Sequence, residues 1–252
     1  MSSIRSCSAT SSQRSVSVGP QELLHSSTFF TLTISILITQ IRHPPAKRPR
    51  ALIDLAAFRF PIFVIFIVGL FLAFIGLYVP YFYIVTYAER LLNTNDSLSF
   101  NFLVVLNAAS LFGRIIPGIL ADKLGSINVM IIFTIASSIL AYAWIAIHDL
   151  LGLIVFCVLY GFCSGAVISL PTTVFASFVP DLQLIGTRMG MSFGFGGLGV
   201  LIGNPIDGSI LNIPENKFTG GIVFCASTLL AGGLAFVIVR ILKADSRKSW
   251  KM

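Results

Sequence analysis

The sequence predicts an all-α transmembrane protein, because its composition and the lengths of its apolar runs both suit a lipid bilayer. Of its 252 residues, 56% are hydrophobic and only 11% are charged, and the mean hydropathy is +0.91. A soluble domain carries about 25% charged residues, so this chain has too little polar surface to fold as a globular protein in water. Its apolar runs reach the ~20 residues that a helix needs to cross ~30 Å of hydrocarbon.

Six strong apolar runs divide the chain, and short connections join them, so neighbouring helices are expected to run antiparallel. A weaker run, 23–41, is interrupted by Thr, Ser and Gln and forms a marginal extra span. The six spans are predicted at 61–87, 99–120, 127–147, 150–179, 187–211 and 218–242. The other segments are a disordered Ser-rich tail over 1–22, a basic cytoplasmic linker over 42–60 and a cytoplasmic tail over 243–252, with the half-bundle of helices over 61–242.

The basic residues are distributed unevenly between the two sets of connections. One set includes the 42–60 linker and the C-terminal tail and holds most of the Lys and Arg, whereas the opposite set holds only Arg90 and Lys217. The positive-inside rule therefore predicts that the linker and the C-terminus are cytoplasmic. We call that end of the helices the inner end and the opposite one the outer end. We expect a multi-pass protein of the plasma membrane rather than of the vacuole or another internal membrane.

Several function classes are disfavoured by the sequence. The net charge is +7, but the Lys and Arg lie between apolar runs and not on a basic face with aromatics, so nucleic-acid binding is not expected. Gly194–Gly199 matches a dinucleotide-binding pattern, yet no strand precedes it, and we reject that interpretation. The sequence contains no Ser/His/Asp set, paired carboxylates or metal cluster, and only His148 lies near a span. We therefore expect no enzyme activity, no cofactor and no metal.

Arg114 lies inside the second strong span, where a charge is costly and marks a functional site by default. Asn107 and Ser110 precede it at helical spacing and share its face. Arg114 either extends to the inner interface, as long side chains do near helix ends, or faces a central cavity and pairs with an anionic substrate. The shared polar stripe favours the cavity, with Arg114, Ser110 and Asn107 as substrate-binding residues.

The first strong span contains a cluster of aromatic residues towards its outer end. We interpret most of them as an aromatic belt at the interface, but Tyr78 and Phe82 share a face and are candidates to reach the cavity. Pro80, within this span, is either a passive kink or a bending point that exposes backbone groups. Asp207, in the fifth span, is expected near the outer mouth, in contact with water.

Glycines and charges mark two places where helices are expected to pack or slide. In the turn after Arg114, Gly118 lets another backbone come close, Asp122 satisfies free N–H groups at the start of the next helix, and Gly125 permits the tight turn. The plain alternative is an ordinary helix-to-helix connection. Two pairs in the fifth span have the small-xxx-small spacing of closely packed membrane helices: Gly190 with Gly194, and Gly199 with Gly203.

The turn Gly118–Gly125, with the pattern Gly-x-x-Ala-Asp-Lys-x-Gly, resembles the motif between the second and third helices of each half in the major facilitator superfamily. Five further segments are similar to the C-terminal half of fungal monocarboxylate-porter-like carriers: 50–59, 78–80, 107–114, 185–191 and 203–206. The resemblance implies a six-helix half of a major-facilitator bundle, without the N-terminal six helices. The marginal span at 23–41 then corresponds to the last helix of the N-terminal half.

The resemblance also implies a function, namely secondary transport of a small organic anion by alternating access, with or without a symported proton. Arg114 aligns with the arginine that binds the carboxylate in animal porters, which have an aspartate at the position of Ser110. Anion binding is thus implied, but proton coupling through that pair is not. Asp122 aligns with a gating carboxylate, and the gate also includes Gly118, Lys123 and Gly125.

The expected partners are the bilayer, the anion, and another half-carrier or a copy of this chain. The alternative is a truncated, non-transporting membrane protein or an assembly partner that lacks the N-terminal half.

Overall fold

The computed structural model describes residues 18–38, 54–178, 182–211 and 218–249. The chain forms two units, 1–50 and 51–252. The first contains helix α1 (Val18–Ile38), which includes the apolar stretch Thr28–Ile38. Residues 18–22 of the predicted tail are therefore helical. Residues 1–17 of that tail and the predicted linker up to residue 53 lie outside the described residues, and a span over 23–41 stays a prediction.

The second unit confirms the six predicted spans, since six of its described helical segments are long and apolar enough to cross a membrane. No strand occurs in the described ranges. A short 3-10 helix, η1 (Leu55–Arg59), precedes the spans. The spans are α2 (Pro61–Leu77) together with α3 (Val79–Leu91), α4 (Asp96–Leu124), α5 (Ser126–Trp144), α6 (Leu150–Phe178), α7 (Leu182–Ile210) and α8 (Thr219–Ser249), which continues into the segment predicted as a tail.

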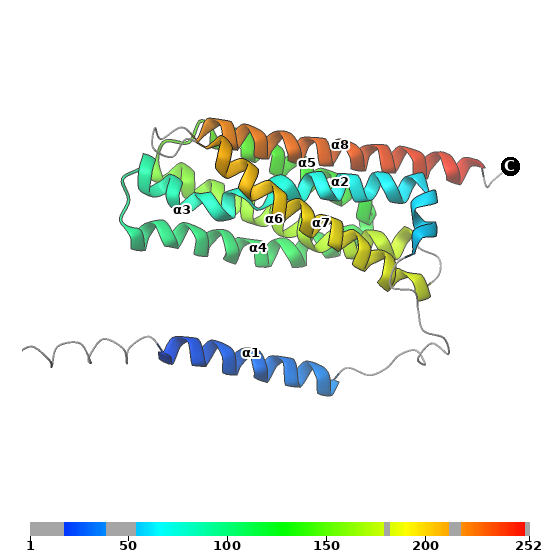
Figure 1. The fold of residues 1–252 in the computed structure, drawn as a ribbon, viewed down its shortest axis with the longest axis horizontal. Helices are drawn as coiled ribbons and strands as arrows, with labels where there is room; N and C mark the ends of the chain where they lie inside the picture. Colours follow the sequence, from blue (N-terminus) through cyan, green and yellow to red (C-terminus); the bar gives the residue numbers. More distant parts are fainter. Residues whose placement is uncertain (1–17, 39–53, 179–181, 212–217, 250–252) are drawn as a thin grey trace, which may run out of the picture. The chain divides into compact units, whose positions relative to one another are not determined.

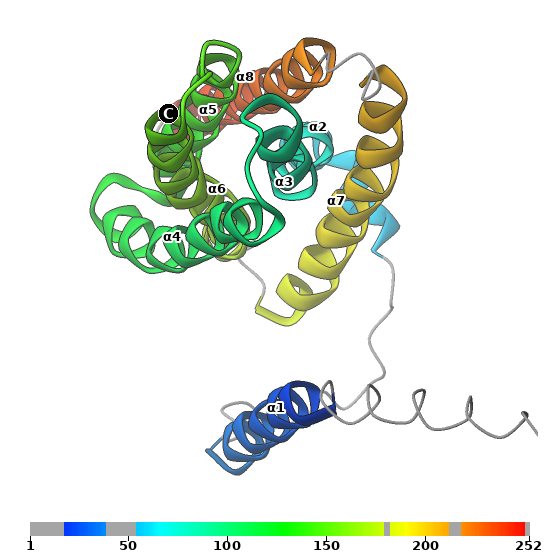
Figure 2. The ribbon, with the colours of Figure 1, turned by 90° about the vertical axis from the view of Figure 1, so that its left-hand side faces the viewer.

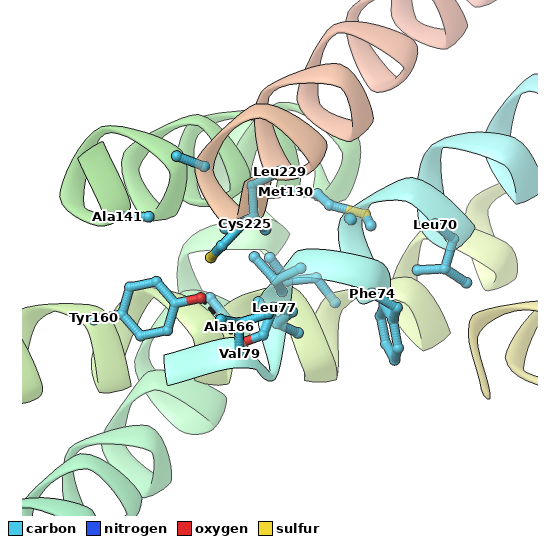
Figure 3. Close-up of a cluster of buried hydrophobic side chains, with 14 of the residues drawn as sticks. Leu70, Phe74, Leu77, Val79, Met130, Ala141, Tyr160, Ala166, Cys225 and Leu229 are labelled. Atoms are coloured by element: carbon cyan, nitrogen blue, oxygen red, sulfur yellow. Dashed lines mark hydrogen bonds between the residues drawn. The ribbon is translucent and has the colours of Figure 1, made fainter. Parts of the chain in front are cut away.

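Pro80 accounts for the interruption between α2 and α3 at Tyr78. Proline has no N–H to donate to the carbonyl of Gly76 four residues earlier, and the buried Cys225 thiol of α8 donates to that oxygen instead, at 3.2 Å. The neighbouring carbonyl of Leu77 accepts the Tyr160 hydroxyl of α6 at 2.9 Å, drawn as a dashed line in Figure 3. Side chains from two other helices thus stabilise the break, as buried backbone groups require.

The buried core lies around this break and is formed by α2, α5, α6 and α8, with further side chains from α3 and α4. Leu70, Phe74, Met130, Leu229 and other apolar side chains converge there in Figure 3. Large rings fill much of the volume: Phe66 packs edge-on against Phe175, with ring centroids 4.8 Å apart. The core therefore ties the first span to the third, fourth and sixth.

Close backbone contacts join α4 to α6, which run side by side (Figure 1). A Cβ added at Gly113 of α4 would collide with the backbone of Phe162, and one added at Gly165 of α6 would collide with the backbone of Ser110. In a bilayer, where lipid tails are as apolar as leucine, such small residues let helices associate through tight packing. We call this contact the α4–α6 seam.

Two helices leave much of their surface uncovered. Only 22% of the apolar window is buried in α4 and in α7, compared with 61% in the α2–α3 span. Seen along the bundle in Figure 2, α4 and α7 lie on different sides of α3. Within the described part of the chain, these two helices therefore have faces that remain available to lipid or to another set of helices.

Candidate functional site

The predicted polar stripe of α4 is divided between a packed and an open surface. Ser110 is buried at the α4–α6 seam, with 4% of its surface exposed, and its hydroxyl donates to the carbonyl of Asn107 at 2.8 Å. Asn107 itself is exposed, and its amide donates to the carbonyl of Leu103 in the preceding turn. Arg114 is also exposed. Ser110 thus belongs to the helix contact, whereas Asn107 and Arg114 lie on the open side.

The Arg114 guanidinium has no hydrogen bond or ion pair with any described residue. It nevertheless lies near enough to the phenols of Tyr78 and Tyr81 for its charge to act on them. A planar fork of donors with no internal acceptor can bind a carboxylate with two parallel hydrogen bonds. The structure therefore brings together Tyr78 and Arg114, two of the predicted substrate-binding residues.

Tyr81 is a residue of this group that sequence reasoning missed, because it was assigned to the outer aromatic belt. Its hydroxyl forms a hydrogen bond with that of Ser164 on α6, with the two oxygens 2.8 Å apart. Its ring lies against that of Tyr78, with centroids 5.8 Å apart. The spacing of three residues between Tyr78 and Tyr81, on either side of Pro80, was the signal that could have paired the two rings. Phe82 is 60% exposed, and the structure does not bring it into this group.

The inner turn has the predicted glycine but not the predicted cap. Gly125 has φ +88°, in the region that favours glycine, and it ends α4 and starts α5. The expectation that Asp122 caps α5 was wrong, because α4 continues to Leu124 and leaves Asp122, which is exposed, in its last turn. Lys123 is exposed too, and a Cβ added at Gly118 would meet no atom within 4 Å.

A polar cavity of about 610 Å³ lies beside this turn. Asp122 and Asn128 line it from the turn and α5, and Arg240 and Lys243 line it from α8. The carboxylate of the predicted gate is therefore next to water-accessible polar groups at the predicted inner end.

The two glycine pairs of α7 differ in their surroundings. Gly199 and Gly203 lie against the backbone of α2, and a Cβ at Gly199 would be 2.6 Å from the carbonyl oxygen of Phe71. This pair has the predicted close packing. A Cβ at Gly190 or Gly194 would meet nothing within 4 Å, so the first pair packs against no described element.

Two ionisable groups on α7 were not predicted correctly. Arg188, near the inner end, pairs with Asp54 at 2.9 Å and lies over the ring of Phe60, an arrangement that the sequence did not reveal. Asp207, expected in contact with water, is fully buried. In the described residues, no group of three His, Cys, Asp or Glu side chains could hold a metal ion.

Comparisons with known proteins identify the family of this arrangement. The Major Facilitator Superfamily profile matches residues 66–251. An MFS-type transporter of Emericella nidulans is 39% identical over 82% of this chain and 47% of the relative. The agnestins efflux protein of Paecilomyces divaricatus is 36% identical over 80% of this chain and 46% of the relative. The chain therefore spans about half the length of the curated relatives it matches.

The same fold occurs in a solved structure, that of the Escherichia coli fucose:proton symporter. The two align with a TM-score of 0.67 over 88% of this chain and 55% of the symporter, at 15% sequence identity. This likeness concerns the fold alone. The six spans, the symporter-like fold and a profile match over most of the six-helix unit lead to one conclusion: the chain belongs to the major facilitator superfamily of membrane transporters.

Proposed function

We propose that this chain is the C-terminal half of a carrier that moves a small organic anion, such as a monocarboxylate, across the membrane by alternating access. The half-length alignments and the resemblance of the segments around Arg114 and Gly203 support this assignment. Carriers built from repeated halves bind their substrate near the middle of the bilayer, between the two halves. The uncovered faces of α4 and α7 are then the surfaces on which the N-terminal half, or a second copy of this chain, packs.

One observation carries the proposal: Arg114 is an exposed cation in a membrane-length helix with no partner among the described residues. An arginine at this depth requires an acceptor, and a substrate carboxylate supplies it. The rings of Tyr78 and Tyr81 add an aromatic surface beside the charge, which suits an anion with an apolar body. Asn107, which is exposed on the same helix as Arg114, is a further substrate contact that we assign to this surface, whereas Phe82 lies outside the group.

The direction of transport that we assign is outward. The agnestins relative is described as an efflux protein, and the likeness to this chain supports export as the physiological direction. The inner gate consists of Asp122, Lys123 and the Gly118–Gly125 turn. We expect a helix of the other half to complete the gate. This helix would pack against the glycines of α4 and α7 that face open space, which include Gly190 and Gly194.

Transport into and out of lipid vesicles tests the proposal. The 252-residue chain is reconstituted alone and together with the N-terminal half of the Emericella nidulans relative, and the flux of radiolabelled benzoate is compared with that of neutral benzamide. We expect benzoate flux above that of empty vesicles only with both halves, and a loss of this flux in Arg114→Ala. Arg90→Ala, at an exposed arginine in the last turn of α3 and outside both the Arg114 group and the gate, is the matched control and keeps the flux.

The second candidate function is a membrane protein that does not transport and serves as an assembly partner, which the half-length alignment also favours. Benzoate and benzamide fluxes equal to those of empty vesicles, with both halves inserted, would favour this alternative. Unchanged benzoate flux in Arg114→Ala would instead remove Arg114 from the site.

A further inference from the structure

Asp207 is an acid buried inside a membrane span without a partner. None of its surface is exposed, and neither carboxyl oxygen forms a hydrogen bond with any described residue. The neighbouring Asn204 has a buried amide oxygen that also lacks a partner among the described residues. Buried polar atoms are nearly always hydrogen-bonded, so these oxygens indicate a role other than packing.

Two other helices, α3 and α8, pack close to Asp207. On α3, the Tyr83 hydroxyl donates to the backbone carbonyl of Asn204 at 3.2 Å and lies so close to α7 that a Cβ at Gly208 would be 2.7 Å from it. On α8, a Cβ at Gly221 would be 2.7 Å from Oδ1 of Asp207. The same Cβ would be 2.6 Å from Cδ2 of Leu211, so the absence of a side chain at Gly221 makes room for both the carboxyl and Leu211.

The groups around Asp207 supply no positive charge from the described helices. The titratable groups that interact with it are the phenol of Tyr83 and the thiol of Cys225, both neutral acids. Helix α2 contains no ionisable residue, and in α6 these are Cys157, Tyr160 and Cys163, none of which bonds to Asp207. Lys217 and Glu215 lie in 212–217, outside the described residues.

An ionised carboxylate in such surroundings would lose its hydration without compensation, at a cost of several kcal/mol, whereas the protonated acid is a small polar group. Burial without a partner among the described residues therefore favours the protonated form of the acid over the carboxylate. We propose that Asp207 is a proton-binding site of the carrier, occupied when α3, α7 and α8 are packed and vacated to water when the outer end of α7 separates.

This site would link protons to conformation, and the link rests on the proposed carrier function. When the predicted outer end opens, water hydrates the carboxyl, which releases its proton as hydronium; on closure, the carboxylate takes one proton back from water. Low pH on that side therefore favours the packed state, because the packed state binds one proton more.

Pro205, inside α7 and two residues before Asp207, lacks the N–H that would strengthen the helix there. Ser110 gives the Arg114 region no acid, so Asp207 is the coupling acid that we assign.

Infrared difference spectroscopy on the 252-residue chain in lipid tests the site without any transport assay. We expect the carbonyl stretch of a protonated carboxylic acid at neutral pH, where exposed aspartates are ionised. The near-isosteric Asp207→Asn abolishes this band, and the exposed-acid control Asp149→Asn leaves it unchanged. Absence of the band in the unmodified chain, or its persistence in Asp207→Asn, would overturn the proposal.

The transport assay with both halves separates this inference from the carrier function. We expect benzoate flux to depend on an imposed pH gradient in the unmodified protein, and to lose that dependence in Asp207→Asn while exchange of labelled for unlabelled benzoate continues. An unaltered pH dependence in Asp207→Asn would contradict the coupling role and leave the carrier function in place. If the unmodified protein carries no benzoate, the carrier proposal fails, and the infrared result still decides whether Asp207 holds a proton.

Discussion

Arg114 and Asp207 are both ionisable side chains inside membrane spans without a partner in the described residues, yet their surroundings are opposite. Arg114 is exposed on α4, a helix of which little is covered. Asp207 is fully buried, and α3 and α8 pack close to it. A permanently charged guanidinium cannot become neutral, so it needs an acceptor from outside the chain. A carboxyl can instead bind a proton, which lowers the free-energy cost of burying it.

The difference teaches how to interpret unpaired charges in a half-bundle. The exposed cation, Arg114, marks the surface on which the substrate and a second set of helices complete the site. The buried acid, Asp207, marks a proton-binding site whose surrounding residues belong to this chain. The glycines repeat the contrast, since Gly113 and Gly203 are pressed against backbones whereas Gly118 and Gly194 face open space.

The largest effect is expected at the α4–α6 seam. Gly113→Val places a branched side chain against the backbone of Phe162 and should lower the free energy of unfolding by about 3 kcal/mol or more, because backbone cannot move aside as a side chain can. Gly118→Val, in the same helix, puts its Cβ where no atom lies within 4 Å, and because valine has a higher helix propensity than glycine, no loss of stability is expected. Thermal unfolding in detergent measures both, and equal losses would mean that the closed and open faces of α4 are not distinct.

A somewhat smaller effect is expected next to Asp207. Gly221→Ala brings a methyl group against Oδ1 and should destabilise the protein by about 1–3 kcal/mol, while Gly197→Ala, which meets nothing within 4 Å, should not. A Cβ at Gly221 would also be 2.6 Å from Cδ2 of Leu211, so Asp207→Ala relieves only the part of the loss that comes from Oδ1. The double variant with Gly221→Ala should therefore lose less stability than the sum of the two single losses. Additive losses in the double-mutant cycle would show that the carboxyl does not lie against Gly221.

Tyr81 provides a test of the aromatic surface that Tyr78 and Tyr81 form beside Arg114. Tyr81→Phe removes the hydrogen bond to Ser164 and should cost about 1 kcal/mol, since the serine hydroxyl at this position is buried. Tyr142→Phe removes an equally short bond to Ser227, but Tyr142 is exposed and the loss should be smaller. Chemical unfolding of the two variants side by side makes the comparison, and a larger loss in Tyr142→Phe would argue against an inward-facing Tyr81.

The smallest effect is expected from a comparison of two arginines, Arg188 on α7 and Arg114 on α4. Arg188→Gln breaks the ion pair with Asp54, which is partly exposed, and should cost at most about 1 kcal/mol, less at high salt. Arg114→Gln breaks no bond to a described residue and should leave the stability of the isolated chain unchanged. A salt-dependent loss of stability in Arg114→Gln would reveal a structural ion pair there.

The sequence predicted the spans well, because long apolar runs and basic connections are dictated by the bilayer itself. It also predicted the turn at Gly125 and the packing of Gly199 and Gly203, whose spacing has a direct steric meaning. It did not predict the surroundings of Tyr81 or Asp207. Whether such side chains face water, lipid or another helix depends on rotation about helix axes, which contacts between distant helices determine.

The capping role of Asp122 failed for a related reason: one further turn of α4 moved the residue from the start of one helix to the end of another. The Arg188–Asp54 pair was missed because its partners are separated by 134 positions in the chain. A single sequence carries no signal that joins them.

The central claim, that Arg114 faces an anion-binding cavity of the assembled carrier, is tested most directly by thiol labelling at this position. Arg114→Cys is made in a Cys7→Ser background, in which the other cysteines are buried, and exposed to a membrane-impermeant thiol reagent with both halves present. We predict rapid labelling that benzoate slows, and no labelling of Leu106→Cys, about two turns earlier on the same helix, whose side chain is buried. Failure of Arg114→Cys to react, or reaction without protection by benzoate, would contradict the account.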